Sequence, residues 1–122
     1  MSERKEDGCS PQDLMAVKDA LEALRGSWKL QILIVLFDGP QRFKEITQGI
    51  KGISDKMLSK ELKELEENAL VTRTVHDTFP PKVEYQVTAH AETLGDVITA
   101  LKHWGRLHRK VVIGAGKEVD ER

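Results

Sequence analysis

Apolar side chains recur every three or four residues along most of the first half of the chain, which is the spacing of helices with one buried face. A first helix is predicted over residues 11–25, with Ser10 as its N-cap. A second helix follows over 28–37, where the sequence WKLQILIVLF is apolar on nearly every side and predicts the most buried element. A short helix is expected at about 44–48, and a fourth over 54–67.

The spacing then changes to strict alternation over residues 71–76 and 83–88, as in two antiparallel strands. Their connection runs from Asp77 to Lys82 and contains two adjacent prolines. It is too long for a two-residue hairpin turn, and the proline rings stiffen it. This connection is therefore expected to project as a wing.

A last helix is predicted after Thr88, which is placed to cap it. Residues 1–10 are expected to form a flexible arm and residues 111–122 a disordered tail, so that 11–110 make up a single folded domain. The predicted fold class is mainly α with a small β wing (α+β), a winged helix-turn-helix with extra N- and C-terminal helices. Apolar residues of the last helix share one face: Leu94, Val97, Ile98, Leu101 and Trp104.

Charge is distributed unevenly, although the formal net charge is only -1 and the pI is about 6.4. Between Arg42 and Lys63, six bases face three acids. One face of the predicted helix 54–67 carries Lys56, Ser59, Lys60 and Lys63, while its leucines repeat on another face. Such a face suits contact with phosphates, but a solvated helix surface produces similar counts, and charge alone leaves both interpretations open.

Composition sets further limits on function. No apolar run approaches the roughly 18 residues of a membrane span, and the polar start lacks a secretory signal, so a cytoplasmic protein with no membrane partner is expected. His76, His90, His103 and His108 do not have the spacing of metal ligands, and no phosphate-binding glycine loop or nucleophile motif is present. We therefore predict no metal, no cofactor and no enzymatic activity, and no sequence pattern identifies a small-molecule effector.

Several short motifs occur in a fixed order along the chain. They are Cys9, Gly26-Ser27-Trp28, Asp38-Gly39-Pro40-Gln41-Arg42-Phe43, the run from Gly52 to Glu66, and the Pro80 to Tyr85 segment. With these motifs the chain resembles the HxlR-type family of bacterial transcriptional regulators over about residues 9–105. It departs from the family pattern at Asn68-Ala69-Leu70, where the family usually has D-G-L.

The resemblance implies that helix 54–67 enters the major groove of double-stranded DNA, where an α-helix fits and base pairs can be distinguished. It also implies that Arg42 and Lys82 bind the flanking backbone or the minor groove. For each cation the alternative is a solubilising surface charge, and for the whole protein it is a winged-helix module that binds another protein instead of DNA. The polar residues of the helix expected to divide between phosphate and base contacts are Ser54, Lys56, Ser59, Lys60 and Lys63.

The first and last helices carry more apolar surface than one small core is expected to cover, and a homodimer would bury it. The resemblance implies dimerisation through these helices, and two-fold symmetry then predicts an inverted-repeat operator with half-sites about 34 Å apart or a multiple of that. The alternative is that the stripe packs only within its own chain. The predicted interface residues are Leu14, Val17, Leu21, Leu94, Val97, Ile98, Leu101 and Trp104.

The only cysteine, Cys9, lies two residues before the first predicted helical position. The positive end of a helix and the nearby Arg4 and Lys5 favour a thiolate there, while neighbouring acids oppose it. The resemblance implies an oxidant or electrophile sensor, since this cysteine position is the sensor in several family members. The alternative is a free thiol without a regulatory role.

Overall fold

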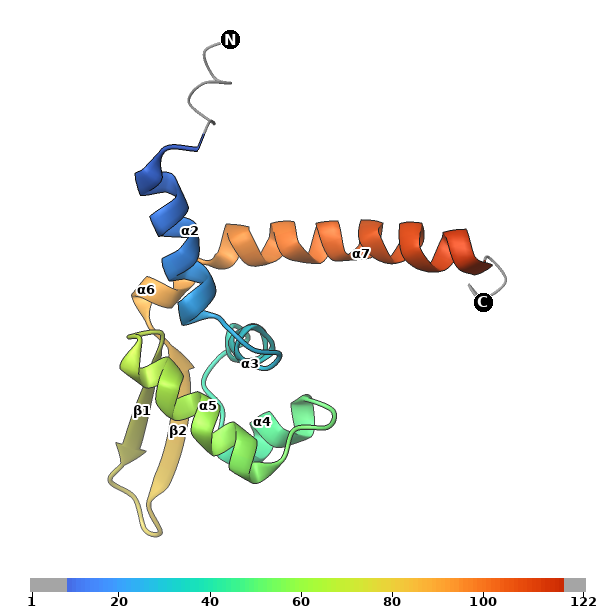
Figure 1. Ribbon diagram of the computed structural model, residues 1–122. Helices are drawn as coiled ribbons and strands as arrows, with labels where there is room; N and C mark the ends of the chain where they lie inside the picture. Colours follow the sequence, from blue (N-terminus) through green and yellow to red (C-terminus); the bar gives the residue numbers. More distant parts are fainter. Residues whose placement is uncertain (1–8, 118–122) are drawn as a thin grey trace.

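Four helices and a two-stranded antiparallel sheet pack around one apolar core, and two further helices project from it (Figure 1). The structure, a computed structural model, describes residues 9–117. The predicted fold class is confirmed as a winged helix-turn-helix. The elements are α2 (Pro11–Ala23), α3 (Lys29–Leu36), α4 (Phe43–Gly49), α5 (Asp55–Glu67), β1 (Val71–His76), β2 (Lys82–Val87), α6 (Ala89–Glu92) and α7 (Gly95–Lys117).

Helix α3 lies at the centre of the core, as its apolar sequence predicted. Ile32 and Leu33 are fully buried, and α5 covers them with leucines that recur at helical spacing. Trp28 packs against the same cluster. Because this face of α5 is buried, the opposite face of the helix is exposed to solvent. The core leucines of α5 are Leu58, Leu62 and Leu65.

Helix α5 begins and ends at well-defined caps. The Ser54 hydroxyl accepts a hydrogen bond from the Met57 amide at 3.1 Å. At the other end the backbone turns back through Ala69, whose φ is 61°, while Asn68 keeps a φ of -94°. Leu70 donates its backbone N–H to the Leu65 carbonyl, which completes a Schellman motif with alanine at the position that favours glycine.

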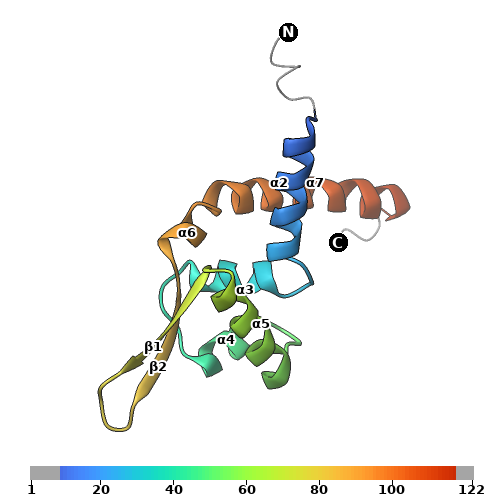
Figure 2. The ribbon, with the colours of Figure 1, turned by 60° about the vertical axis from the view of Figure 1, so that its left-hand side comes forward.

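The wing is confirmed at the predicted place. Strands β1 and β2 pair antiparallel from Val71 opposite Val87 to His76 opposite Lys82, and the connecting loop projects away from the helices (Figure 2). Gln41 forms an isolated bridge with Tyr85, so the extended piece before α4 adds to the same sheet. This bridge holds the start of α4 beside the wing.

The last helix differs from the prediction in two ways. Thr88 caps only the short helix α6, accepting a hydrogen bond from the Ala91 amide at 3.0 Å, and a new helix starts at Gly95. Helix α7 then continues to Lys117, so residues 111–117 are helical and the disordered tail predicted from residue 111 is wrong for them. The rest of that tail, 118–122, and residues 1–8 of the predicted arm lie outside the described residues.

Helices α2 and α7 stand apart from the core in both views (Figures 1 and 2). Helix α2 contains no buried residue, and α7 extends well beyond the rest of the fold. Among the described residues, no helix combines the length and the apolar character that crossing a membrane requires.

Candidate nucleic-acid interface

The outward face of α5 carries the polar residues that the sequence analysis selected. All of them are exposed, because the leucines on the opposite face hold that face against the core. Asp55 occupies the first turn, where a negative charge complements the helix dipole. The structure thus brings together the predicted set on one helix: Ser54, Lys56, Ser59, Lys60 and Lys63.

A hollow between α4 and the wing contains further cations. Arg42, Lys44 and Lys82 line it together with wing prolines. The Glu45 carboxylate accepts a hydrogen bond from the Arg42 backbone N–H at 2.8 Å, which closes the first turn of α4. Arg42 and Lys82, separated by forty positions in the sequence, both line this hollow. Lys44 was not among the predicted site residues, because only the fold brings it to this hollow.

A second hollow lies between α5 and the sheet. Ser59 and Lys63 line it with Arg73 of β1 and Tyr85 of β2. Arg73 is exposed and was not among the predicted residues. Arg73 lies two residues after the buried Val71 and so shares its face of β1, but the sequence does not show that this face lies beside the cationic face of α5.

Not every cation of the interface is free of ion pairs. Lys60 Nζ lies 3.4 Å from Glu64 Oε2 and 3.8 Å from Glu61 Oε2. Lys82 Nζ lies 3.7 Å from Glu84, whose other carboxylate oxygen is 2.9 Å from His76 Nε2. These neighbouring acids lower the net positive charge of the interface.

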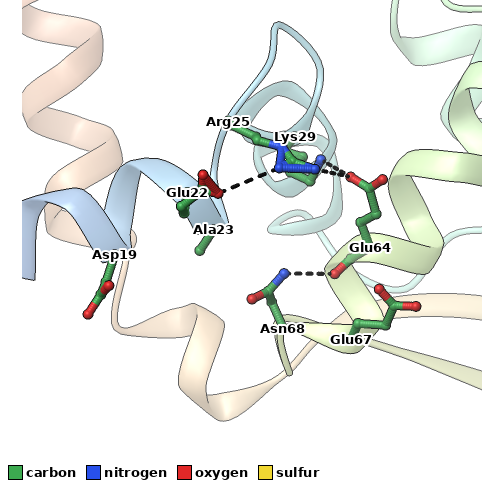
Figure 3. A pocket seen from close by; sticks show the side chains of 8 residues that line it. All are labelled: Asp19, Glu22, Ala23, Arg25, Lys29, Glu64, Glu67 and Asn68. Carbon is green, nitrogen blue, oxygen red and sulfur yellow. Dashed lines mark hydrogen bonds and ion pairs between the residues drawn. The ribbon is translucent and has the colours of Figure 1, made fainter.

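Behind the exposed face, a buried ion pair joins α3 to α5 (Figure 3). The ammonium of Lys29 donates hydrogen bonds to Glu61 at 2.5 Å and to Glu64 at 2.6 Å, and the whole Lys29 residue is only 2% exposed. Arg25 Nη2 lies 3.8 Å from the same Glu64 oxygen and also pairs with Glu22. Lys29 was not among the predicted functional residues, although a single lysine at the start of an apolar helix indicates a buried charge that needs a partner.

The charges of this pair stabilise one another. Burial acts to lower the pKa of Lys29, but hydrogen bonds and the negative charges of Glu61 and Glu64 outweigh it and raise that pKa overall. The hydrogen bond from Lys29 holds the pKa of Glu64 below its ordinary value, and Lys60 adds to this effect. Lys29 and Glu64 therefore both stay charged at neutral pH, and their pairing helps to fix the position of α5 on α3.

The apolar surface predicted for dimerisation is largely exposed. Within residues 9–117, ten of the thirteen exposed large hydrophobic residues lie on α2 and α7, which concentrates the surface on the two projecting helices. Ile98 is buried within its own chain and Leu94 packs against the core, so both were wrongly assigned to the free surface. Residues predicted and found exposed are Leu14, Val17, Leu21, Val97, Leu101 and Trp104; those missed are Met15, Leu107, Val111 and Val112.

Cys9 is exposed and lies directly before the N-cap of α2. The Ser10 hydroxyl accepts from the Asp13 amide at 3.1 Å, and the Asp13 carboxylate accepts from the Ser10 amide, forming a capping box. Within residues 9–117 no group of three or more His, Cys, Asp or Glu side chains is placed to hold a metal ion.

A winged helix whose helix α5 presents an exposed cationic face defines a helix-turn-helix protein of the transcription-regulator class. The model of HxlR-like helix-turn-helix proteins matches residues 23–112, most of the chain. The chain belongs to this family, whose members are transcriptional regulators and not enzymes.

Three relatives illustrate the likeness. The HTH-type transcriptional regulator YybR of Bacillus subtilis is 34% identical over 117 residues, which is 92% of this chain and 89% of the relative. The solved structure of the redox regulator HypR in its reduced form has a TM-score of 0.76 and 34% identity, covering 81% of this chain and 98% of that one. The reduced form of the transcriptional regulator YodB from B. subtilis has a TM-score of 0.69 and 40% identity, covering 80% and 91%.

Proposed function

We propose that the protein is a homodimeric, sequence-specific DNA-binding regulator that recognises an inverted-repeat operator. The observation that carries this proposal is the outward face of α5, where Lys56, Lys60 and Lys63 are all exposed. Further cations line a hollow beside α5 and another between α4 and the wing. Membership in the helix-turn-helix family supports the same assignment.

In this proposal α5 lies in the major groove. The groove is about 12 Å wide and admits an α-helix, and lysines at the helix surface bind phosphates on its two walls. The hydroxyls of Ser54 and Ser59 are short enough to lie close to base edges when the helix is inserted. Arg42 and Lys82 bind the backbone beside the wing. Phosphate contacts then supply affinity and register, while base contacts supply specificity.

The dimer follows from the apolar faces of α2 and α7. Leu14, Val17 and Leu21 leave one stripe on α2 exposed, and Leu101 and Trp104 leave another on α7. An exposed apolar surface of this size is a liability in a monomer. A second copy with two-fold symmetry covers both stripes and presents a second α5 to the same side of the duplex.

Salt dependence tests DNA binding. If lysines of α5 neutralise phosphates, log K falls linearly with log salt, and Lys56→Ala makes the slope shallower by about 0.9 per subunit. Lys102→Ala is the matched control, because Lys102 is equally exposed but lies on α7. If the slope of log K against log salt is the same in the wild type and in the alanine variants of Lys56, Lys60 and Lys63, the proposal of DNA binding is wrong. A protein-binding module is then the remaining candidate function.

A second proposed role is redox sensing through Cys9. Cys9 is exposed at the start of α2, the helix proposed to lie in the dimer interface, and the similar HypR is described as a redox regulator. Oxidation of two Cys9 thiols to a disulfide across the dimer releases two protons and two electrons to an oxidant such as diamide, and would shift α2 against the partner. A change in DNA affinity on diamide treatment that persists in Cys9→Ser would exclude this role.

A further inference from the structure

Lys60 differs from the other lysines of α5 in its surroundings. Two carboxylate oxygens lie within 3.8 Å of its ammonium, one from Glu61 and one from Glu64. In the part of the chain that the structure describes, no such pair forms at Lys56 or Lys63. A phosphate that approaches Lys60 must therefore compete with charges that already belong to the protein.

The competing carboxylates are held in place from inside the fold. In both glutamates one oxygen, Oε1, accepts from the buried Lys29, while the other, Oε2, faces Lys60. The side chain of Glu61 is 8% exposed and that of Glu64 24% exposed, against 64% for Lys60. Figure 3 shows Glu64 reaching from α5 toward Lys29 and Arg25. Because the core already orders both carboxylates, pairing with them costs entropy only on the lysine side.

We propose that Glu64 is a specificity-determining residue that restrains Lys60 from binding phosphates of non-specific DNA. This inference rests on the proposed DNA-binding function and concerns the same face of α5. On random duplex, affinity comes almost wholly from phosphate contacts, so a lysine paired with Glu64 contributes little. On the operator, base contacts fix the position of α5 in the groove, and Lys60 keeps its carboxylate partners, so the charge of Glu64 matters little to operator affinity.

The magnitude is modest and measurable. An exposed lysine–glutamate pair one helical turn apart is worth about a twofold change in an equilibrium constant, so freeing one lysine per subunit tightens non-specific binding by a dimer about fourfold. The slope of log K against log salt steepens by about 0.9 per subunit at the same time.

The test uses Glu64→Gln in the full chain, because glutamine keeps an acceptor for Lys29 and removes the negative charge. Glu67→Gln is the matched control: it makes the same charge change one turn along α5, at an exposed residue. Binding is measured on a mixed-sequence duplex and on the tightest duplex selected from a random library. We expect Glu64→Gln to tighten binding to the mixed duplex about fourfold more than Glu67→Gln, with little change on the selected duplex. Urea unfolding shows whether each variant is folded.

A double-variant cycle tests whether Glu64 acts through Lys60. Lys60→Gln should reduce the salt slope by about 0.9 per subunit in the Glu64→Gln background and by clearly less in the wild-type background. Equal reductions in both backgrounds, or equal effects of Glu64→Gln and Glu67→Gln, would overturn the inference while leaving DNA binding intact. A wild-type protein without salt-dependent duplex binding would instead overturn the proposed function and this inference with it.

Discussion

The buried ion pair at Lys29 gives the sharpest prediction for stability. The substitution Lys29→Met replaces the ammonium by an apolar side chain of similar length. Lys29 is 2% exposed, and its partner Glu61 has a side chain that is 8% exposed. After the substitution the Glu61 carboxylate lies buried without its counter-ion, so the folded state loses stability although the core gains an apolar group.

Removing one member of a buried pair typically costs about 3 to 5 kcal/mol. The lower end applies here, because Glu64 is partly exposed and Lys60 remains near both carboxylates. We expect Lys29→Met to lower the free energy of unfolding by about 3 kcal/mol, a large part of the total of a domain of this size, and the melting temperature by about 10 °C.

Urea unfolding followed by circular dichroism measures this difference. Lys60→Met is the control, because Lys60 contacts the same two carboxylates but is 64% exposed, and its loss should cost no more than about 0.5 kcal/mol. If the two variants lose equal stability, the reasoning that burial makes the Lys29 pair matter is wrong.

The pKa shifts fix the pH range in which the network stabilises the fold. The pKa of Glu64 is lowered from its ordinary value of 4.5, so its contribution is present above that value and is lost as pH falls through the lower folded-state pKa. The pKa of Lys29 is raised from 10.5, so its contribution is present below that value and is lost as pH rises through the higher folded-state pKa. The free energy of unfolding of the wild type should therefore fall at acidic and at strongly alkaline pH. In Lys29→Met the fall at alkaline pH should be absent.

Three further predictions concern other parts of the fold. Ala69→Gly should stabilise the protein by about 0.5 to 1 kcal/mol, because glycine adopts the positive φ of this residue without strain, whereas Asn68→Gly should not; equal urea midpoints for Ala69→Gly and the wild type would contradict this. Trp104→Asp should give a monomer in analytical ultracentrifugation at concentrations where the wild type is a dimer, and an unchanged mass would refute the proposed interface. Diamide should alter DNA affinity of the wild type but not of Cys9→Ser, as measured by fluorescence anisotropy.

Local sequence signals predicted the helices and the wing well because caps and periodicity act over short distances. Ser54 and the leucine spacing were enough to orient α5 with its lysines outward. The pairing of Lys29 with Glu61 was not predictable in this way, since the two residues are 32 positions apart and meet only when α3 packs on α5. The same applies to Arg73, which the sheet brings beside α5.

The wrong predictions for the C-terminal helices have local physical causes. The break before α7 arises because the single turn of α6 ends at Thr93, and apolar spacing alone continues through that break. The apolar stripe of α7 was followed only to Trp104, so Leu107 and Val111 were missed. Ile98 shares the period of the exposed stripe but is buried, because it lies in the first turn of α7, before the helix extends away from the domain.

The central claim is that two copies of α5 are presented together to one duplex, and a hydroxyl-radical footprint on the tightest duplex selected from a random library tests it most directly. The account predicts two equivalent protected segments related by two-fold symmetry, centred about 34 Å or a multiple of that apart, and their loss in Lys56→Ala. A single protected segment, or protection that Lys56→Ala leaves unchanged, would contradict it.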